Sequence, residues 1–327
     1  MNTVTTFLNA TPWLRLTVDI AGIIIPLSAL LAFAGTGFLS AAAKLLFLRT
    51  GRAAYDKCAK QLACLGLVLG WLLLTGGRVW LSLTLDAPGA LPPQTIVTEA
   101  CWIFLGAGVL FISFSYALWK FLAAYPVAHA LISLLGALQG LAALLTALAA
   151  ARCLTALTDS GASSYAPDIL FLPDWRSPFW NALSYTPLLM LAMSGASGAL
   201  WLLCRRRYED FGRDYYTAMI LWCAAWARNT WAALWIVLLI SSAVLIYQQP
   251  NGFSAGNAVE QTVRLLLWLL PALIWTIVCR AKTPLRHKFA LVTAFLVAVV
   301  FTLPYYLDIT DLTMDYFSVG AHATQSP

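Results

Sequence analysis

The hydrophobic residues of this chain form long continuous runs separated by short polar segments. Each of eight runs is about 20 to 32 residues long, which is enough for a helix to cross the hydrocarbon core of a bilayer. The runs show no alternation of apolar and polar positions, so the pattern predicts helices and not strands. The eight predicted membrane-spanning helices are 19–47, 61–84, 98–123, 127–156, 182–204, 215–246, 261–280 and 287–307.

The composition supports this interpretation. Hydrophobic residues make up 61% of the 327 residues and charged residues only 10%, whereas a soluble domain has about 25% charged residues. We therefore predict an all-α polytopic membrane protein without a soluble domain. Its predicted parts are a first four-helix half (1–157), an outer interfacial loop (158–181), a second four-helix half (182–309) and an outer tail (310–327). The loop is expected to lie flat at headgroup depth, although it could instead cover a cavity between helices.

Basic residues gather in alternate turns of the chain. Most of the 20 lysines and arginines lie in the turns after the first, third, fifth and seventh predicted helices, whereas the other turns and the tail carry few basic residues. Cytoplasmic loops of membrane proteins have such an excess of basic residues. The pattern therefore predicts both termini outside, and we expect a multi-pass protein of the bacterial inner membrane. The sequence pI of about 9.0 reflects this anchoring and not binding to nucleic acid.

The ends of the first and fifth predicted helices resemble each other. Each has a patch of small residues, then leucines, then arginines, then a tyrosine with an acidic neighbour, in “AFAGTGFLSAAAKLLFLRTGRAAYDKCAK” and “AMSGASGALWLLCRRRYEDFGRDYYTAM”. Small residues at helical spacing let helices approach closely in lipid. Four spans separate the two copies, so both halves would enter from the same side, as in a parallel repeat of two four-helix units.

One arginine, Arg228, interrupts the very apolar segment “WCAAWARNTWAALW”. It lies about 22 Å along the helix from Arg213, well inside the hydrocarbon layer. An isolated charge at that depth costs several kcal/mol, so we expect it to have a partner. Trp231 and Trp235 follow one and two turns later, which makes a cation–π contact one candidate. A ligand or cofactor group and a structural ion pair are the other candidates.

Five ionisable residues lie near the predicted outer ends of five different helices. Arg78 ends the second helix, Arg152 ends the fourth, Arg264 begins the seventh, Asp19 begins the first and Glu99 begins the third. Together they could form a polar shelf beneath the outer surface. Such a shelf suits a quinone head group, since a carbonyl needs a hydrogen-bond donor and a carboxylate can take the proton of a quinol. Alternatively, each residue only caps a helix end or extends its charge toward water.

The histidines and cysteines do not form a pattern typical of haem or metal binding. His287 lies in a predicted cytoplasmic turn and His322 in the tail, and only His129 lies near a span, where we expect an interfacial position. A transmembrane b-type haem usually takes histidine or histidine–methionine axial ligands. The seven cysteines form no CxxC pair. We therefore expect neither haem nor a metal site, and we expect Lys44, at the end of the first helix, to extend toward water.

Several segments carry a resemblance to a known family. They are “IIIPLSALLAFAG”, “LLFLRTGRAAYDKCAKQLACLGLVLGWLLLTGG”, “VTEACWIFLGAGVLF”, “VAHALISLLGALQGLAALL” and “SPFWNALSYTPLLMLAMSGASGALWLLCRRRYEDFGRDYY”. With Pro26 in the first span, Tyr55 in the basic turn, Glu99 opening the third span and His129 opening the fourth, this region resembles the large subunit of cytochrome bd-type quinol oxidases. The resemblance covers about two-thirds of the chain and implies that Glu99 matches the proton-path acid of the family.

The chain departs from that family at the haem ligands. The first-span histidine of the family falls near Ala21, its fifth-span histidine falls in “NALSYT”, and its long quinol-binding loop is replaced by “QQPNGFSAGNAVEQ”. The resemblance therefore implies a haem-free relative that does not reduce oxygen. The chain is also similar in plan to the haem-free eight-helix membrane anchors of polysulfide- and dimethyl-sulfoxide-reductase-type complexes, which pass quinol electrons to an iron–sulfur partner.

These observations lead to one preferred function and two alternatives. We expect a haem-free subunit of a respiratory or redox complex that binds quinone near the outer face through Arg78, Glu99, Arg152 and Asp19. Arg228 would organise a second polar site or pair with the helix of a partner. Such a chain would not be an enzyme alone, because it would need partner subunits that carry haem or iron–sulfur clusters. The alternatives are a small-molecule or ion transporter or channel, and a structural assembly subunit.

Overall fold

The computed structural model describes residues 11–79, 92–160, 178–248, 255–281 and 284–310. In these ranges the chain is helical apart from short turns, and none of these residues lies in a strand. Eight helices of this described part are long and apolar enough to cross a membrane. The predicted all-α polytopic fold is therefore confirmed.

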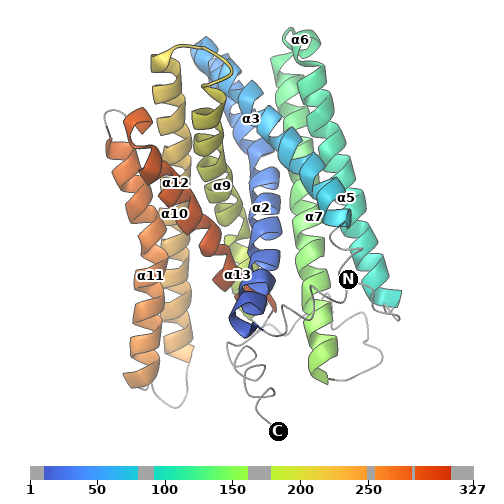
Figure 1. The fold of residues 1–327 in the computed structure, drawn as a ribbon, viewed down its shortest axis with the longest axis vertical. Helices are drawn as coiled ribbons and strands as arrows, with labels where there is room; N and C mark the ends of the chain where they lie inside the picture. Colours follow the sequence, from blue (N-terminus) through green and yellow to red (C-terminus); the bar gives the residue numbers. More distant parts are fainter. Residues whose placement is uncertain (1–10, 80–91, 161–177, 249–254, 282–283, 311–327) are drawn as a thin grey trace.

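The helices form an elongated bundle in which successive long helices run in opposite directions (Figure 1). The first part of the chain contains α2 (Pro12–Thr50), α3 (Ala53–Leu72), the π-helical turn η1 (Leu73–Gly77), α5 (Pro92–Ala117), the single-turn α6 (Trp119–Leu122) and α7 (Pro126–Ser160). The second part contains α9 (Pro178–Arg205), α10 (Arg213–Gln248), α11 (Ala255–Arg280), the 3-10 turn η2 (Pro284–Arg286), α12 (Lys288–Val300) and α13 (Thr302–Thr310).

The two ends of the bundle differ in charge. The turns from α2 to α3, from α5 to α7, from α9 to α10 and from α11 to α12 all lie at one end, which is uppermost in Figure 1. We call it the basic end, because it carries most of the lysines and arginines, and we call the other the opposite end. The sequence predicts that the basic end is cytoplasmic.

Several helices extend beyond the predicted spans. The first begins at Pro12 instead of residue 19, and the fourth continues to Ser160, because a helix pairs its own backbone groups outside the hydrocarbon as well as inside it. The eighth span is divided at Phe301, and Pro304, which has no N–H to donate, stands in the first turn of α13, where helices tolerate proline. Most of the predicted interfacial loop and nearly all of the predicted tail lie outside the described residues.

Helices α2 and α9 lie at the centre of the bundle and contact each other. At their contact, a Cβ atom on Gly35 would collide with the carbonyl oxygen of Met190, so the two backbones touch where small residues face each other. This contact confirms that the small-residue patches let helices approach closely. Toward the opposite end, the Ser28 and Thr302 hydroxyls share a hydrogen bond of 3.1 Å that connects α2 to α13.

The two basic turns after α2 and α9 have the same backbone feature. Gly51 and Gly212 both adopt the left-handed conformation, with φ of 67° and 86°, which residues with a side chain rarely adopt. They are 161 positions apart in the sequence. The same separation relates Pro26 to Pro187, Lys44 to Arg205, Arg52 to Arg213, Tyr55 to Tyr216 and Glu99 to Glu260. The organisation in two four-helix halves remains a prediction, which this spacing supports.

Candidate functional site

Two of the predicted site residues, Arg78 and Glu99, meet near the opposite end of the bundle. Arg78 follows η1 and Glu99 lies in α5, and the distance from Arg78 Nη1 to Glu99 Oε1 is 3.2 Å. The two side chains are 55% and 50% exposed. A pair as exposed as this contributes about 1 kcal/mol or less to stability, so a ligand can replace one of its contacts at little cost.

The π-helical turn brings Arg78 beside an aromatic ring. A π turn adds a residue to the helical repeat and so shifts the direction of the residues that follow. Gly77 ends this turn, and a Cβ atom there would lie 3.0 Å from the Trp102 ring. The guanidinium carbon of Arg78 lies 5.7 Å from the centroid of the same ring. The guanidinium, the carboxylate and the indole therefore form one group, which we call the outer pair site.

The outer pair site lies at the end of a lipid-facing surface. Ile103, Leu110 and Phe114 are exposed on α5, at spacings that place them on the same face of the helix as Glu99. Large exposed apolar side chains are expected where a helix contacts lipid tails. A lipid-soluble molecule that moves along this face toward the opposite end would therefore reach the charged pair where the apolar surface ends.

Asp19 and Arg152, the other predicted quinone-binding residues, lie on α2 and α7. Their side chains lie outside the described part, although both helices place these positions toward the opposite end. Whether they complete the polar shelf therefore remains a prediction.

Arg228 lies in α10, apart from the outer pair site. Its Nε and Nη2 atoms both donate to Asn229 Oδ1, at 3.0 and 2.8 Å. The cation–π contact considered for Arg228 is not formed with either tryptophan. Trp231 is fully buried against Trp268, and the Trp235 indole donates to the Leu265 carbonyl oxygen on α11.

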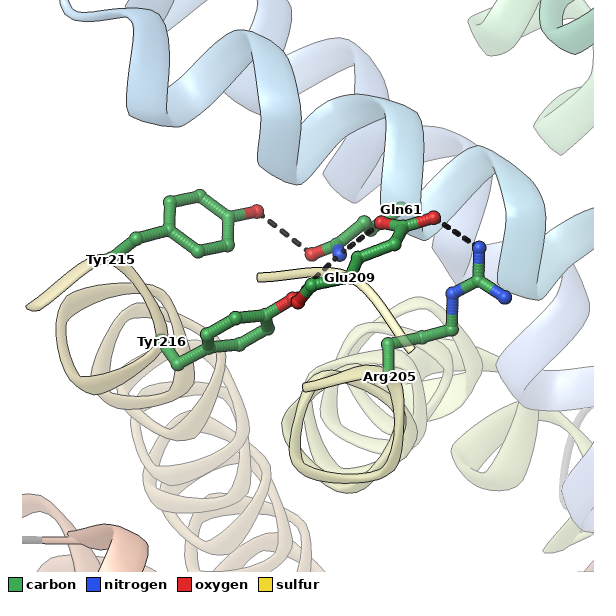
Figure 2. Close-up of polar contacts among 5 residues, drawn as sticks. All are labelled: Gln61, Arg205, Glu209, Tyr215 and Tyr216. Carbon is green, nitrogen blue, oxygen red and sulfur yellow. Dashed lines mark hydrogen bonds and ion pairs between the residues drawn. The ribbon is translucent and has the colours of Figure 1, made fainter. Parts of the chain in front are cut away.

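A second polar group, at the basic end, was not predicted. Figure 2 shows Gln61 of α3 between Glu209, in the turn after α9, and two tyrosines at the start of α10. Gln61 is only 3% exposed. It donates to Glu209 Oε2 at 2.8 Å and accepts from the Tyr215 hydroxyl at 2.8 Å. Arg205 forms an ion pair with Glu209, and the Tyr216 hydroxyl donates to the Glu209 carbonyl oxygen at 2.5 Å.

These residues, which we call the basic-end cluster, mainly bind one another. Gln61, Glu209 and both tyrosine hydroxyls each have a partner within the group, and buried polar groups are stable only when their hydrogen bonds are satisfied. The cluster therefore connects α3 to the α9–α10 turn. Its members are up to 155 positions apart, and no spacing rule in the sequence indicates such a contact.

The expectation that Lys44 extends toward water is wrong. Lys44 is 3% exposed, its Nζ is 2.5 Å from Asp56 Oδ1, and it lies 4.7 Å from the centroid of the Trp119 ring. His129 lies in the first turn of α7, so its predicted interfacial position stays a prediction, and its side chain is only 1% exposed, with its Nε2 3.1 Å from the Ser115 carbonyl oxygen. Both side chains are enclosed because α5, α6 and α7 pack around the end of α2 and α3.

Comparison of this chain with models of known protein families, with curated proteins and with solved structures gave no match. The resemblance to the quinol oxidase subunit therefore remains a prediction. Among the described residues, no group of three or more His, Cys, Asp or Glu side chains is placed to hold a metal ion.

Proposed function

We propose that this chain is a haem-free membrane subunit of a redox complex and that it binds the head group of a quinone at the outer pair site. The observation that carries the proposal is the half-exposed ion pair between Arg78 and Glu99 at the end of a lipid-facing apolar surface. Quinones are lipid-soluble molecules with a flat polar head, so such a site matches both parts of the molecule.

The three side chains of the site have complementary tasks. The Arg78 guanidinium donates a hydrogen bond to a quinone carbonyl, and the Glu99 carboxylate accepts a proton from a quinol hydroxyl. The Trp102 ring offers an apolar face beside the guanidinium, and its buried indole N–H has no acceptor among the described residues. The isoprenoid tail lies along the exposed apolar side chains of α5.

The proposal includes a place and a partner for the chain. The eight spans support a multi-pass membrane protein, and we place it in the inner membrane of a bacterium with its basic end in the cytoplasm. Electrons from the quinol pass to a haem or iron–sulfur centre of a partner subunit, because the side chains of the outer pair site bind and exchange protons only.

The test is the quinone content of the purified protein. The chain is purified from its native membrane in a mild detergent, its lipid-soluble molecules are extracted, and quinone is quantified per chain together with the visible spectrum. We expect about one quinone per chain and no Soret band. Arg78→Gln and Glu99→Gln should each weaken quinone binding about tenfold, since each removes a contact worth about 1.4 kcal/mol, and should therefore lower the quinone content.

Arg207→Gln is the matched control, because Arg207 is an exposed arginine at the basic end and its loss should leave the quinone content unchanged. Equal quinone content in the wild type and in both site variants would contradict the proposal, as would purified protein without quinone. A b-type Soret band would contradict the haem-free part of it.

A further inference from the structure

Arg228 lies at the centre of a membrane span. It is in the middle of the 32-residue span Arg213–Val244, and the residue is only partly buried. Asn229 is exposed and stands on the same face of α10 as Ile236 and Ile240, whose side chains are also exposed. The Arg228–Asn229 pair therefore borders the part of the helix surface that contacts lipid.

The contacts within the chain do not compensate the charge of Arg228. Among the described residues, only the side-chain oxygen of Asn229 binds the guanidinium, and it occupies the edge formed by Nε and Nη2. An amide oxygen is neutral, so the positive charge remains without a counter-charge, and Nη1 lacks an acceptor in this part of the chain. A charge at the middle of a bilayer is costly unless it meets an opposite charge or water.

A second copy of this chain cannot supply the counter-charge. Four acidic residues fall within the eight spans, namely Asp19, Asp56, Glu99 and Asp214. Each of them is among the first four residues of its span, near the membrane surface and far from the depth of Arg228. A carboxylate at the depth of Arg228 can therefore come only from another kind of molecule that reaches the middle of the bilayer.

The first half of the chain shows what this surface is like without the charge. The separation of 161 positions that relates the two halves places Leu67 and Val68 of α3 at the positions of Arg228 and Asn229. Val68 is exposed, as Asn229 is. At the position that this separation makes equivalent, α3 therefore presents apolar side chains, whereas α10 carries the polar pair.

We propose that the face of α10 around Arg228 and Asn229 is the docking surface for a transmembrane helix of a different protein that carries an aspartate or glutamate at mid-depth. The carboxylate of that helix binds the Nη1 and Nη2 edge of Arg228, and its apolar side chains cover Ile236 and Ile240. We choose an acidic helix as the partner because its charge complements that of Arg228. An arginine in a low-dielectric medium binds a carboxylate more strongly than any neutral group.

A synthetic probe tests the docking surface in purified components. The full chain is placed in lipid nanodiscs with a fluorescently labelled, leucine-rich transmembrane peptide that has one aspartate at its centre. The reference peptide has leucine at this position, and a third peptide has the aspartate two turns nearer one end. Association is measured by energy transfer. We expect the central-aspartate peptide to bind about tenfold more tightly than either of the others.

The Arg228→Leu variant should lose this preference, and Arg228→Lys should keep part of it because the charge remains. Arg280→Leu is the matched control: Arg280 is an exposed arginine at the basic end of the neighbouring helix α11, and its loss should leave the tenfold preference intact. Equal binding of the three peptides to the wild-type chain would overturn the proposal. An unchanged preference in correctly folded Arg228→Leu would do the same.

The native membrane provides an independent test. A photo-crosslinking amino acid at position 236 should attach to a membrane helix that has an acidic residue at the depth of Arg228, and Arg228→Leu should reduce the yield of this adduct. An adduct with a second copy of the chain, with a helix that lacks such a residue, or no adduct would contradict the proposal. This result does not depend on quinone, so the outer pair site and the docking surface can fail separately.

Discussion

Lys44 and Asp56 show how this protein accommodates a charge inside its own structure. The Lys44 ammonium is enclosed by the Phe47 and Trp119 rings, at 5.6 and 4.7 Å from their centroids, and its partner Asp56 is about one-third exposed. A charge removed from water in this way depends on its partner, because the attraction must compensate the loss of hydration. The ion pair therefore fixes the turn between α2 and α3.

Asp56→Ala should lower the free energy of unfolding by about 2 kcal/mol or more, since it leaves the Lys44 ammonium enclosed without a carboxylate. The measurement is reversible unfolding in mixed detergent micelles. Lys60→Ala is the control, because Lys60 is an exposed basic residue of the same helix, and its effect should stay within about 0.5 kcal/mol. Equal effects of the two substitutions would show that the ion pair does not stabilise the protein.

The sequence was sufficient to predict some of these residue contacts and not others. Arg78 and Glu99 end and begin consecutive helices, so their proximity follows from topology alone. Gln61 and Glu209 are 148 positions apart, and their contact depends on how α3 packs against the α9–α10 turn. The burial of Lys44 and His129 depends in the same way on packing between helices that a hydropathy pattern does not specify.

Single helices in this protein are recognisable from hydropathy, but their contacts depend on small residues. Gly35 and Ser194, on α2 and α9, lie at a close contact between the two helices. The patches of small residues indicated close packing, but only the structure shows the partners: Gly35 faces α9, whereas Gly37 faces α7 and Gly195 faces α10. The division of the last span at Phe301 was also missed, because a proline in the first turn of a helix does not interrupt the apolar pattern.

Gly35→Ala should destabilise the protein by about 1 to 3 kcal/mol, because the added methyl group would force α2 away from the Met190 carbonyl oxygen of α9. Gly106→Ala is the matched control. Gly106 lies in a helix with open space around the added atom, so alanine should be neutral there or stabilise by up to about 1 kcal/mol. Thermal unfolding in detergent measures both, and a stable Gly35→Ala variant would contradict the close contact.

For the molecule as a whole, an even number of spans puts both ends of the described chain on the same side of the membrane. The eight candidate spans agree in order and position with those predicted from hydropathy. Which side the ends face is determined by the distribution of lysine and arginine. This part of the architecture is predictable from sequence because the bilayer imposes the same length and polarity on every span.

Reporter fusions should show that the basic end is cytoplasmic. Alkaline phosphatase, which is active only outside the cytoplasm, should be active when fused after the last residue, Pro327, and green fluorescent protein at this position should stay dark. The opposite result is expected for fusions after Arg207, in the turn between α9 and α10. Fluorescence of the fusion at residue 327 would show that the orientation is the reverse of the predicted one. The outer pair site would then lie near the cytoplasmic face of the membrane.

The contact between α2 and α9 limits how the molecule can move. A transporter that works by rocking two halves must open the interface between them at one end and then at the other. Here Gln61 connects α3 to Tyr215 and Glu209 at the basic end, and the Ser28–Thr302 hydrogen bond connects α2 to α13 toward the opposite end. Rocking in either direction would break these hydrogen bonds, two of which are buried. The described contacts therefore hold the two parts of the bundle together at both of its ends, and the proposed entry of a quinone from the lipid needs no such rocking.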